Sequence, residues 1–82
     1  MRIPWTDFIA VLSMELDLPP DTLLATSRLK WELGVDSFTK ISLVLHFEDL
    51  YDVLVPEAEI VAALTVESLW KAVNGVSLLP EA

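Results

Sequence analysis

The sequence predicts an all-α protein, a four-helix bundle with a long loop between the first two helices and a short third helix. Apolar residues recur every three or four positions in separate stretches, as they do on one face of a helix. Proline, glycine and capping residues separate these stretches, and no alternation of strands and helices indicates a parallel sheet. The 82 residues are enough for one small core, so we expect a single domain over residues 1–82.

The first helix is expected over residues 4–17. Pro4 suits its first turn, where the missing N–H group is not needed. Its buried face consists of Trp5, Phe8, Ile9, Leu12 and Leu16, widened by Ala10, Val11 and Met14. Leu18 precedes Pro19 and is therefore pushed away from the α conformation, which ends the helix.

Residues 19–36 form the long loop. A connection of this length without regular structure is uncommon in a compact domain and is often functional. We expect Leu24, Leu29 and Leu33 to enter the core and hold the loop in place. Trp31 is also expected to pack in the core, and a contact with a partner is the alternative use of its large ring.

The second helix is expected over residues 37–51, with either Asp36 or Ser37 capping the N–H groups at its start. Successive residues lie about 100° apart around a helix, which divides its surface into faces. The core face is expected to hold Leu43, Val44, Phe47, Leu50 and Tyr51. The solvent face is expected to hold Thr39, Ser42, His46 and Asp49.

A third stripe on the second helix is apolar but turned away from the core face. The apolar stripe consists of Phe38, Ile41 and Leu45, and it is more apolar than the surface of a monomer requires. Either the preceding loop covers it or partners dock on it. Its position favours docking.

Two short helices complete the expected bundle. The third is expected over residues 57–63 and the fourth over residues 66–74. Thr65 suits the cap of the fourth helix, and Gly75 suits a left-handed stop at its end. We expect the tail, residues 76–82, to be loose.

The composition excludes several classes of function. Thirteen acidic residues against five basic ones give a formal charge of −8, which disfavours nucleic acids and anionic membranes and favours basic partners. There is no cysteine and only one histidine, so disulfides, thiolate metal ligands and a histidine zinc site are excluded. We therefore expect neither a bound metal nor enzymatic activity.

The sequence also gives expectations about the setting of the protein. No apolar run approaches the roughly 18 residues of a membrane span, and no signal-peptide pattern opens the chain. We expect a cytoplasmic monomer without membrane contact. Met1 and the short tail are typical of a free-standing protein, although a module cut from a longer chain would look the same.

A spaced pattern of residues runs through nearly the whole chain, centred on Ser37. It reads Leu29-x3-Leu33-Gly34-Val35-Asp36-Ser37-Phe38, then Ile41-x-Leu43-Val44, Phe47-Glu48-x2-Tyr51, Val55-Pro56 and Leu64-Thr65-Val66. In this pattern and in its helix order, the chain resembles the acyl carrier protein family, which includes the peptidyl carrier domains. A lone Asp-Ser pair would be a weak signal, whereas the full spacing is fairly specific.

The resemblance implies that Ser37 receives 4′-phosphopantetheine from coenzyme A through a separate phosphopantetheinyl transferase, a Mg²⁺ enzyme. The arm would hold acyl or aminoacyl groups as thioesters. Asp36 and Gly34 would shape the turn, with Gly34 relieving crowding beside the serine. The residues agree, because a helix N-terminus suits a phosphate group.

The resemblance also implies partners. Phe38, Ile41, Leu45 and Glu48 would meet the transferase, a loading enzyme (an adenylating ligase or an acyltransferase) and downstream synthase or tailoring enzymes. The acidic residues expected to face basic patches on these partners are Asp36, Glu48, Asp49, Asp52, Glu57 and Glu59.

The chain departs from the family pattern just after the serine. Carriers of fatty acid synthesis usually have acidic residues where this chain has Thr39, Lys40 and Ser42, and Phe38 stands where leucine or methionine is commoner. These departures favour a carrier in polyketide or nonribosomal peptide biosynthesis over one in fatty acid synthesis.

Two further alternatives come from outside the carrier family. One is a non-enzymatic helical interaction module that acts independently of Ser37. The other, a small hydrolase with Ser37 as nucleophile, has little support because His46 would lie on the opposite side of the helix.

Overall fold

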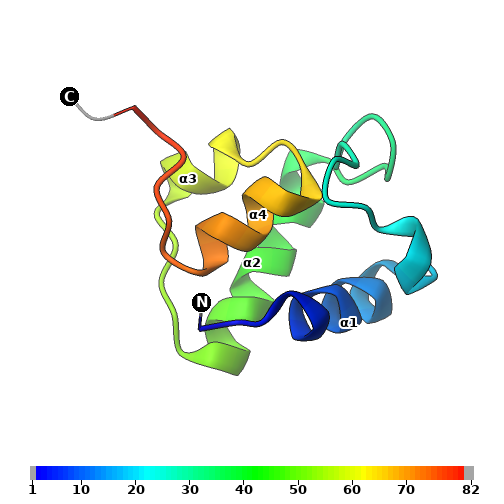
Figure 1. The fold of residues 1–82 in the computed structure, drawn as a ribbon. Coiled ribbons are helices and arrows are strands. Elements are labelled where there is room, and N and C mark those ends of the chain that lie inside the picture. The colour runs from blue at the N-terminus through cyan, green and yellow to red at the C-terminus, as the bar shows by residue number, and fades with distance from the viewer. Residues whose placement is uncertain (1, 81–82) are drawn as a thin grey trace.

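The computed structural model describes residues 2–80 and confirms the all-α four-helix bundle (Figure 1). Its helices are α1 (Trp5–Leu16), α2 (Ser37–Tyr51), α3 (Glu57–Ala62) and α4 (Val66–Val73), with one 3₁₀ turn, η1 (Pro20–Thr22), after α1. Over residues 2–80 no strand forms, although an isolated antiparallel bridge joins Arg28 to Thr65. The long loop runs up one side of the bundle from α1 to the start of α2 (Figure 1).

Local signals set most of the helix ends. Pro4 lies just before α1 as its N-cap, and Asp17 ends the helix in a left-handed conformation with φ 54°, one residue earlier than expected. Thr65 caps α4 as expected, and the Ser68 side chain completes a capping box with it. Gly75 follows α4 with φ 80°, which glycine adopts without strain.

Aromatic rings form the centre of the core. Phe8 of α1 stacks on Phe47 of α2 with ring centroids 5.0 Å apart, and Trp5 meets Trp70 edge-on at 5.2 Å. The expected buried faces are largely confirmed. They contribute Phe8, Ile9 and Leu12 from α1 and Leu43, Val44 and Phe47 from α2.

Three core positions expected on the helices are wrong. Leu50 is 54% exposed because it lies at the margin of the buried face, in the last turn of α2. Met14 and Ala10 do not widen the buried face of α1, since Met14 is 77% exposed and Ala10 is exposed as well.

The loop is anchored differently from the prediction. Leu29 is buried and Leu33 is half-buried, as expected, but Leu23 enters the core while Leu24 is exposed. Trp31 is also exposed, contrary to the prediction of a core ring. It lies in a tight turn closed by the bonds from the N–H groups of residues 32 and 33 to the Arg28 carbonyl, and this turn faces solvent.

Backbone hydrogen bonds join the middle of the loop to the connection before α4. The Leu29 N–H donates to the Leu64 carbonyl, and the Val66 N–H donates to the Ser27 carbonyl, both at 3.0 Å. These bonds flank the bridge between Arg28 and Thr65. The loop is therefore part of the folded framework.

The tail is held as far as Leu78, contrary to the expectation that it is loose; residues 81–82 lie outside the described part. The Glu59 carboxylate accepts hydrogen bonds from the Leu78 N–H (2.6 Å) and the Ser77 hydroxyl (2.7 Å). These bonds hold the pKa of Glu59 below its usual value. Because Glu59 is buried against the tail, which passes beside α3 in Figure 1, it is not a surface acid facing partners as expected.

Candidate functional site

Ser37 is the first residue of α2, and its side chain is exposed. Asp36 supplies the N-cap, because its carboxylate accepts a hydrogen bond of 2.8 Å from the Thr39 N–H. This bond lowers the pKa of the Asp36 carboxyl group. Across residues 2–80 no hydrogen bond involves the Ser37 hydroxyl, so this hydroxyl is available at the corner of the bundle.

The turn before Ser37 requires a glycine for its backbone conformation. Gly34 has φ 70°, in the left-handed region that side chains disfavour. A Cβ built at this position would meet no atom within 4 Å, so the expected role of Gly34 in relieving crowding is wrong. The next residue, Val35, is buried and donates its N–H to the Leu29 carbonyl at 2.8 Å, which fixes the approach to Ser37.

Lys40 lies on the buried face of α2, not among the residues that partners would meet. Only 8% of it is exposed, and its ammonium donates to the carbonyls of Ala63 (2.8 Å) and Val61 (3.3 Å). These carbonyls end α3, where a positive charge is favourable. Burial lowers the pKa of the Lys40 ammonium. From the sequence, Lys40 was interpreted only as a departure from the family pattern, although its helical position between core residues was a signal of burial.

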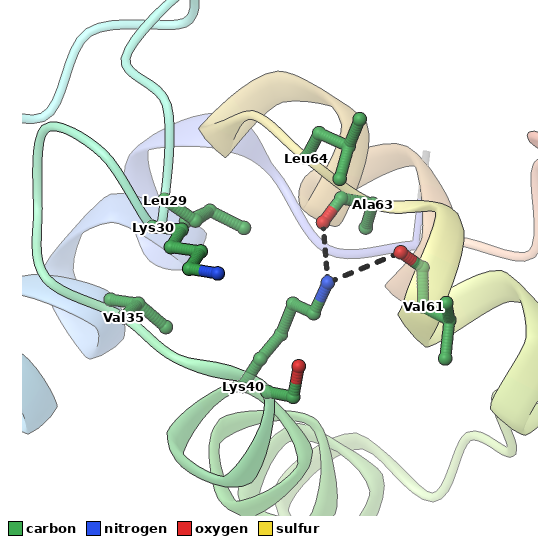
Figure 2. A pocket seen from close by; sticks show the side chains of 8 residues that line it. Leu29, Lys30, Val35, Lys40, Val61, Ala63 and Leu64 are labelled. Atoms are coloured by element: carbon green, nitrogen blue, oxygen red, sulfur yellow. Dashed lines mark hydrogen bonds between the residues drawn. The ribbon is translucent and has the colours of Figure 1, made fainter.

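A small cavity of about 120 Å³ lies beside Ser37, between the loop, α2 and the end of α3. No pattern in the sequence indicated this cavity. Its lining consists of Leu29, Lys30, Val35, Ser37, Lys40, Val61, Ala63 and Leu64. Figure 2 shows Lys40 reaching from α2 across this space to the carbonyls at the end of α3.

The apolar stripe is exposed, so the alternative in which the loop covers it is excluded. Phe38 is 80%, Ile41 36% and Leu45 58% exposed. Glu48, expected beside this stripe, is half-buried, and its carboxylate accepts a hydrogen bond of 2.7 Å from the Val55 N–H. It therefore stabilises the connection between α2 and α3.

His46 lies on the surface, as expected. Its Nε2 is 3.2 Å from a carboxylate oxygen of Glu15, so the pair links α2 to α1. The described residues contain no group of three or more His, Asp or Glu side chains that could hold a metal ion. They also contain no helix long and apolar enough to cross a membrane.

The sequence matches no model of a known protein family, and no curated protein matches it either. The structural observations on Ser37 are therefore those of its own surroundings. These are an exposed hydroxyl at a helix start, a cap supplied by a neighbour and a small cavity alongside.

Proposed function

We propose that this protein is a carrier in which Ser37 holds a 4′-phosphopantetheine arm, as its resemblance to acyl and peptidyl carrier proteins implies. The main support is the Ser37 hydroxyl, which is exposed at the first residue of α2 while Asp36 takes over the capping role. The arm, once attached, ends in a thiol that holds acyl or aminoacyl groups as thioesters. The protein itself is not an enzyme in this proposal.

The surroundings of Ser37 suit a phosphodiester. The N–H groups in the first turn of a helix lack partners within the helix, and the positive end of the helix dipole favours a phosphate there. α2 has 15 residues, so this dipole is well developed. Lys30 lines the cavity beside Ser37 and helps to lower the pKa of Asp36, so a positive charge lies close to this corner.

Attachment requires only the serine hydroxyl from this chain. The Ser37 oxygen bonds to the phosphorus next to the pantetheine of coenzyme A, the pyrophosphate bond breaks, and adenosine 3′,5′-bisphosphate leaves. The hydroxyl proton goes to a base on the transferase. His46, the one histidine of the chain, is paired with Glu15 and is not needed.

The proposed partners are the phosphopantetheinyl transferase, an adenylating ligase or acyltransferase that loads the arm, and downstream synthase or tailoring enzymes. The exposed apolar stripe supports docking of such partners on α2, with the half-buried Glu48 at its edge. Acidic residues around this docking surface would mainly raise the rate at which the protein encounters basic surfaces of its partners.

A polyketide or nonribosomal peptide pathway is the proposed setting. One of the departures that favoured it over fatty acid synthesis is weaker, because Lys40 is buried and does not face partners. The departures at Thr39 and Ser42 remain, and Ser42 is exposed.

The test is incubation with coenzyme A, Mg²⁺ and a transferase of broad specificity, followed by intact mass measurement. We expect the mass of one phosphopantetheine group to be added. Ser37→Ala should stay unmodified and folded, because Ser37 is exposed and does not cap α2. Ser42→Ala, which changes another exposed serine of α2, should be modified like the wild type. An unmodified wild-type protein would refute the carrier proposal.

A helical interaction module is the second candidate, favoured by the exposed apolar stripe and by the exposed Trp31. Its partner would bind whether or not Ser37 is present. Undiminished binding and biological activity of Ser37→Ala would favour this candidate over the carrier.

A further inference from the structure

We infer that Lys40 closes the space between α2 and α3 beside Ser37, so that cargo on the arm stays at the surface instead of entering the helical core. This inference rests on the proposed function, because it concerns what Ser37 carries. The cargo of this carrier is then a short or polar acyl or aminoacyl group, which does not need an apolar pocket.

The cavity beside Ser37 is lined by the proposed attachment residue itself, which makes it the internal space adjacent to a chain attached there. Leu29, Val35 and Ala63 give it an apolar wall. Lys40 crosses it from the buried face of α2, and its ammonium ends between the carbonyls of Val61 and Ala63 (Figure 2).

The volume of the cavity limits what it can hold. It measures about 120 Å³, whereas pockets for small molecules usually measure roughly 300–1,000 Å³. An apolar cavity of about 150 Å³ accommodates a molecule of the size of benzene. The cavity beside Ser37 is therefore too small for a long alkyl chain unless the groups around it move.

Lys40 opposes such a movement. A chain that extended between α2 and α3 would have to displace its ammonium from the Ala63 and Val61 carbonyls. Ala63 is fully buried, so its carbonyl would lose its hydrogen bond where water does not easily replace it. If the ammonium stayed in place, an alkyl chain would pack against a buried charge, which is also unfavourable.

The experiment loads the arm in one step. The transferase is supplied with acetyl-coenzyme A or octanoyl-coenzyme A, and each acylated product is checked by intact mass. Tm and amide NMR shifts are then compared between the two forms. In the wild type we expect equal Tm values and equal shifts at Leu29, Val35, Val61 and Ala63. A buried octanoyl chain would instead raise Tm by roughly 4–8 °C or more and move these signals.

Lys40→Met removes the ammonium and leaves a flexible apolar side chain. In this variant we expect the octanoyl form to melt above the acetyl form and the cavity signals to differ. Lys30→Met is the matched control, because Lys30 lines the same cavity and its ammonium lies 5.0 Å from the Trp31 ring centroid, whereas the hydrogen bonds to the carbonyls at the end of α3 come from Lys40. Whatever its effect on attachment, its acetyl and octanoyl forms should have equal Tm values and equal cavity signals, as in the wild type. Comparing two acyl forms within each variant cancels any change in its basal stability.

The outcomes separate the two claims. If no mass is added, the carrier proposal fails and the inference fails with it. If the mass is added and the wild-type octanoyl form is stabilised with moved cavity signals, the carrier proposal stands and the inference is overturned. The inference is also overturned if the two acyl forms of Lys40→Met are indistinguishable, because Lys40 is then not what excludes the chain. The wild-type comparison is decisive even if a variant does not fold.

Discussion

Leu45→Ala should slow modification by the transferase while costing no more stability than a matched substitution elsewhere. Leu45 belongs to the apolar stripe and is 58% exposed, whereas Leu24 lies in the loop and is 59% exposed. Substituting alanine for either leucine removes the same atoms from residues of nearly equal exposure. A difference between the two variants in the rate of modification therefore reports on docking, and not on the stability of the fold.

The expected size follows from these exposures. Burying a whole leucine side chain is worth about 1.5–3 kcal/mol, so covering the exposed part of Leu45 in a complex contributes about 1–1.7 kcal/mol. That corresponds to a loss of about 5- to 20-fold in kcat/KM. The already buried part accounts for a destabilisation of about 0.6–1.3 kcal/mol in either variant.

The assay measures the initial rate of phosphopantetheine transfer at several carrier concentrations, with unfolding in urea as the measure of stability. We expect Leu24→Ala to match the wild type in kcat/KM and to match Leu45→Ala in stability. Equal rates for the two variants, whether both fall or neither does, would refute docking on the apolar stripe.

Two further predictions concern the carboxylates that hold backbone N–H groups. Because hydrogen bonds from Leu78 and Ser77 lower the pKa of Glu59 below its usual 4.5, the stability from this contact is fully present above pH 4.5 and is lost as pH falls through the lowered value. Glu59→Ala, which removes the acceptor, should expose the Leu78 amide to faster hydrogen exchange at neutral pH, and unchanged exchange would contradict the contact. Asp36→Ala should lower the protection of the Thr39 amide from hydrogen exchange. Asp36→Asn should keep this protection, because asparagine also caps helices. Equal protection in the two variants would show that the Asp36 side chain does not form the cap.

Sequence reasoning succeeded where structure depends on neighbours along the chain. The spacing of Phe8, Ile9 and Leu12 revealed a buried helix face, and Thr65 marked the start of α4. The start of α2 at Ser37 was also expected, with Asp36 as one of its two possible caps. Caps and helical periods are local, so they can be recognised without knowledge of the fold.

It failed where distant segments decide the outcome. The loop has no regular period, so nothing local distinguished Leu23, which is buried, from Leu24, which is exposed. The angular position of Lys40 indicated burial, but a buried ammonium needs partners. Its partner Ala63 lies 23 residues further along the chain, and only the packing of α3 brings that carbonyl within reach.

The hydrogen bonds between the loop and the start of α4 have a mechanical consequence for a carrier. They divide the long connection between α1 and α2 into two shorter segments, so the backbone next to Ser37 has less conformational freedom than in an unattached loop of the same length. If Ser37 carries the proposed arm, its attachment point is therefore fixed relative to the bundle. In the proposed function, the distance over which cargo can travel is set by the length of the arm, and the protein contributes the direction from which the arm starts.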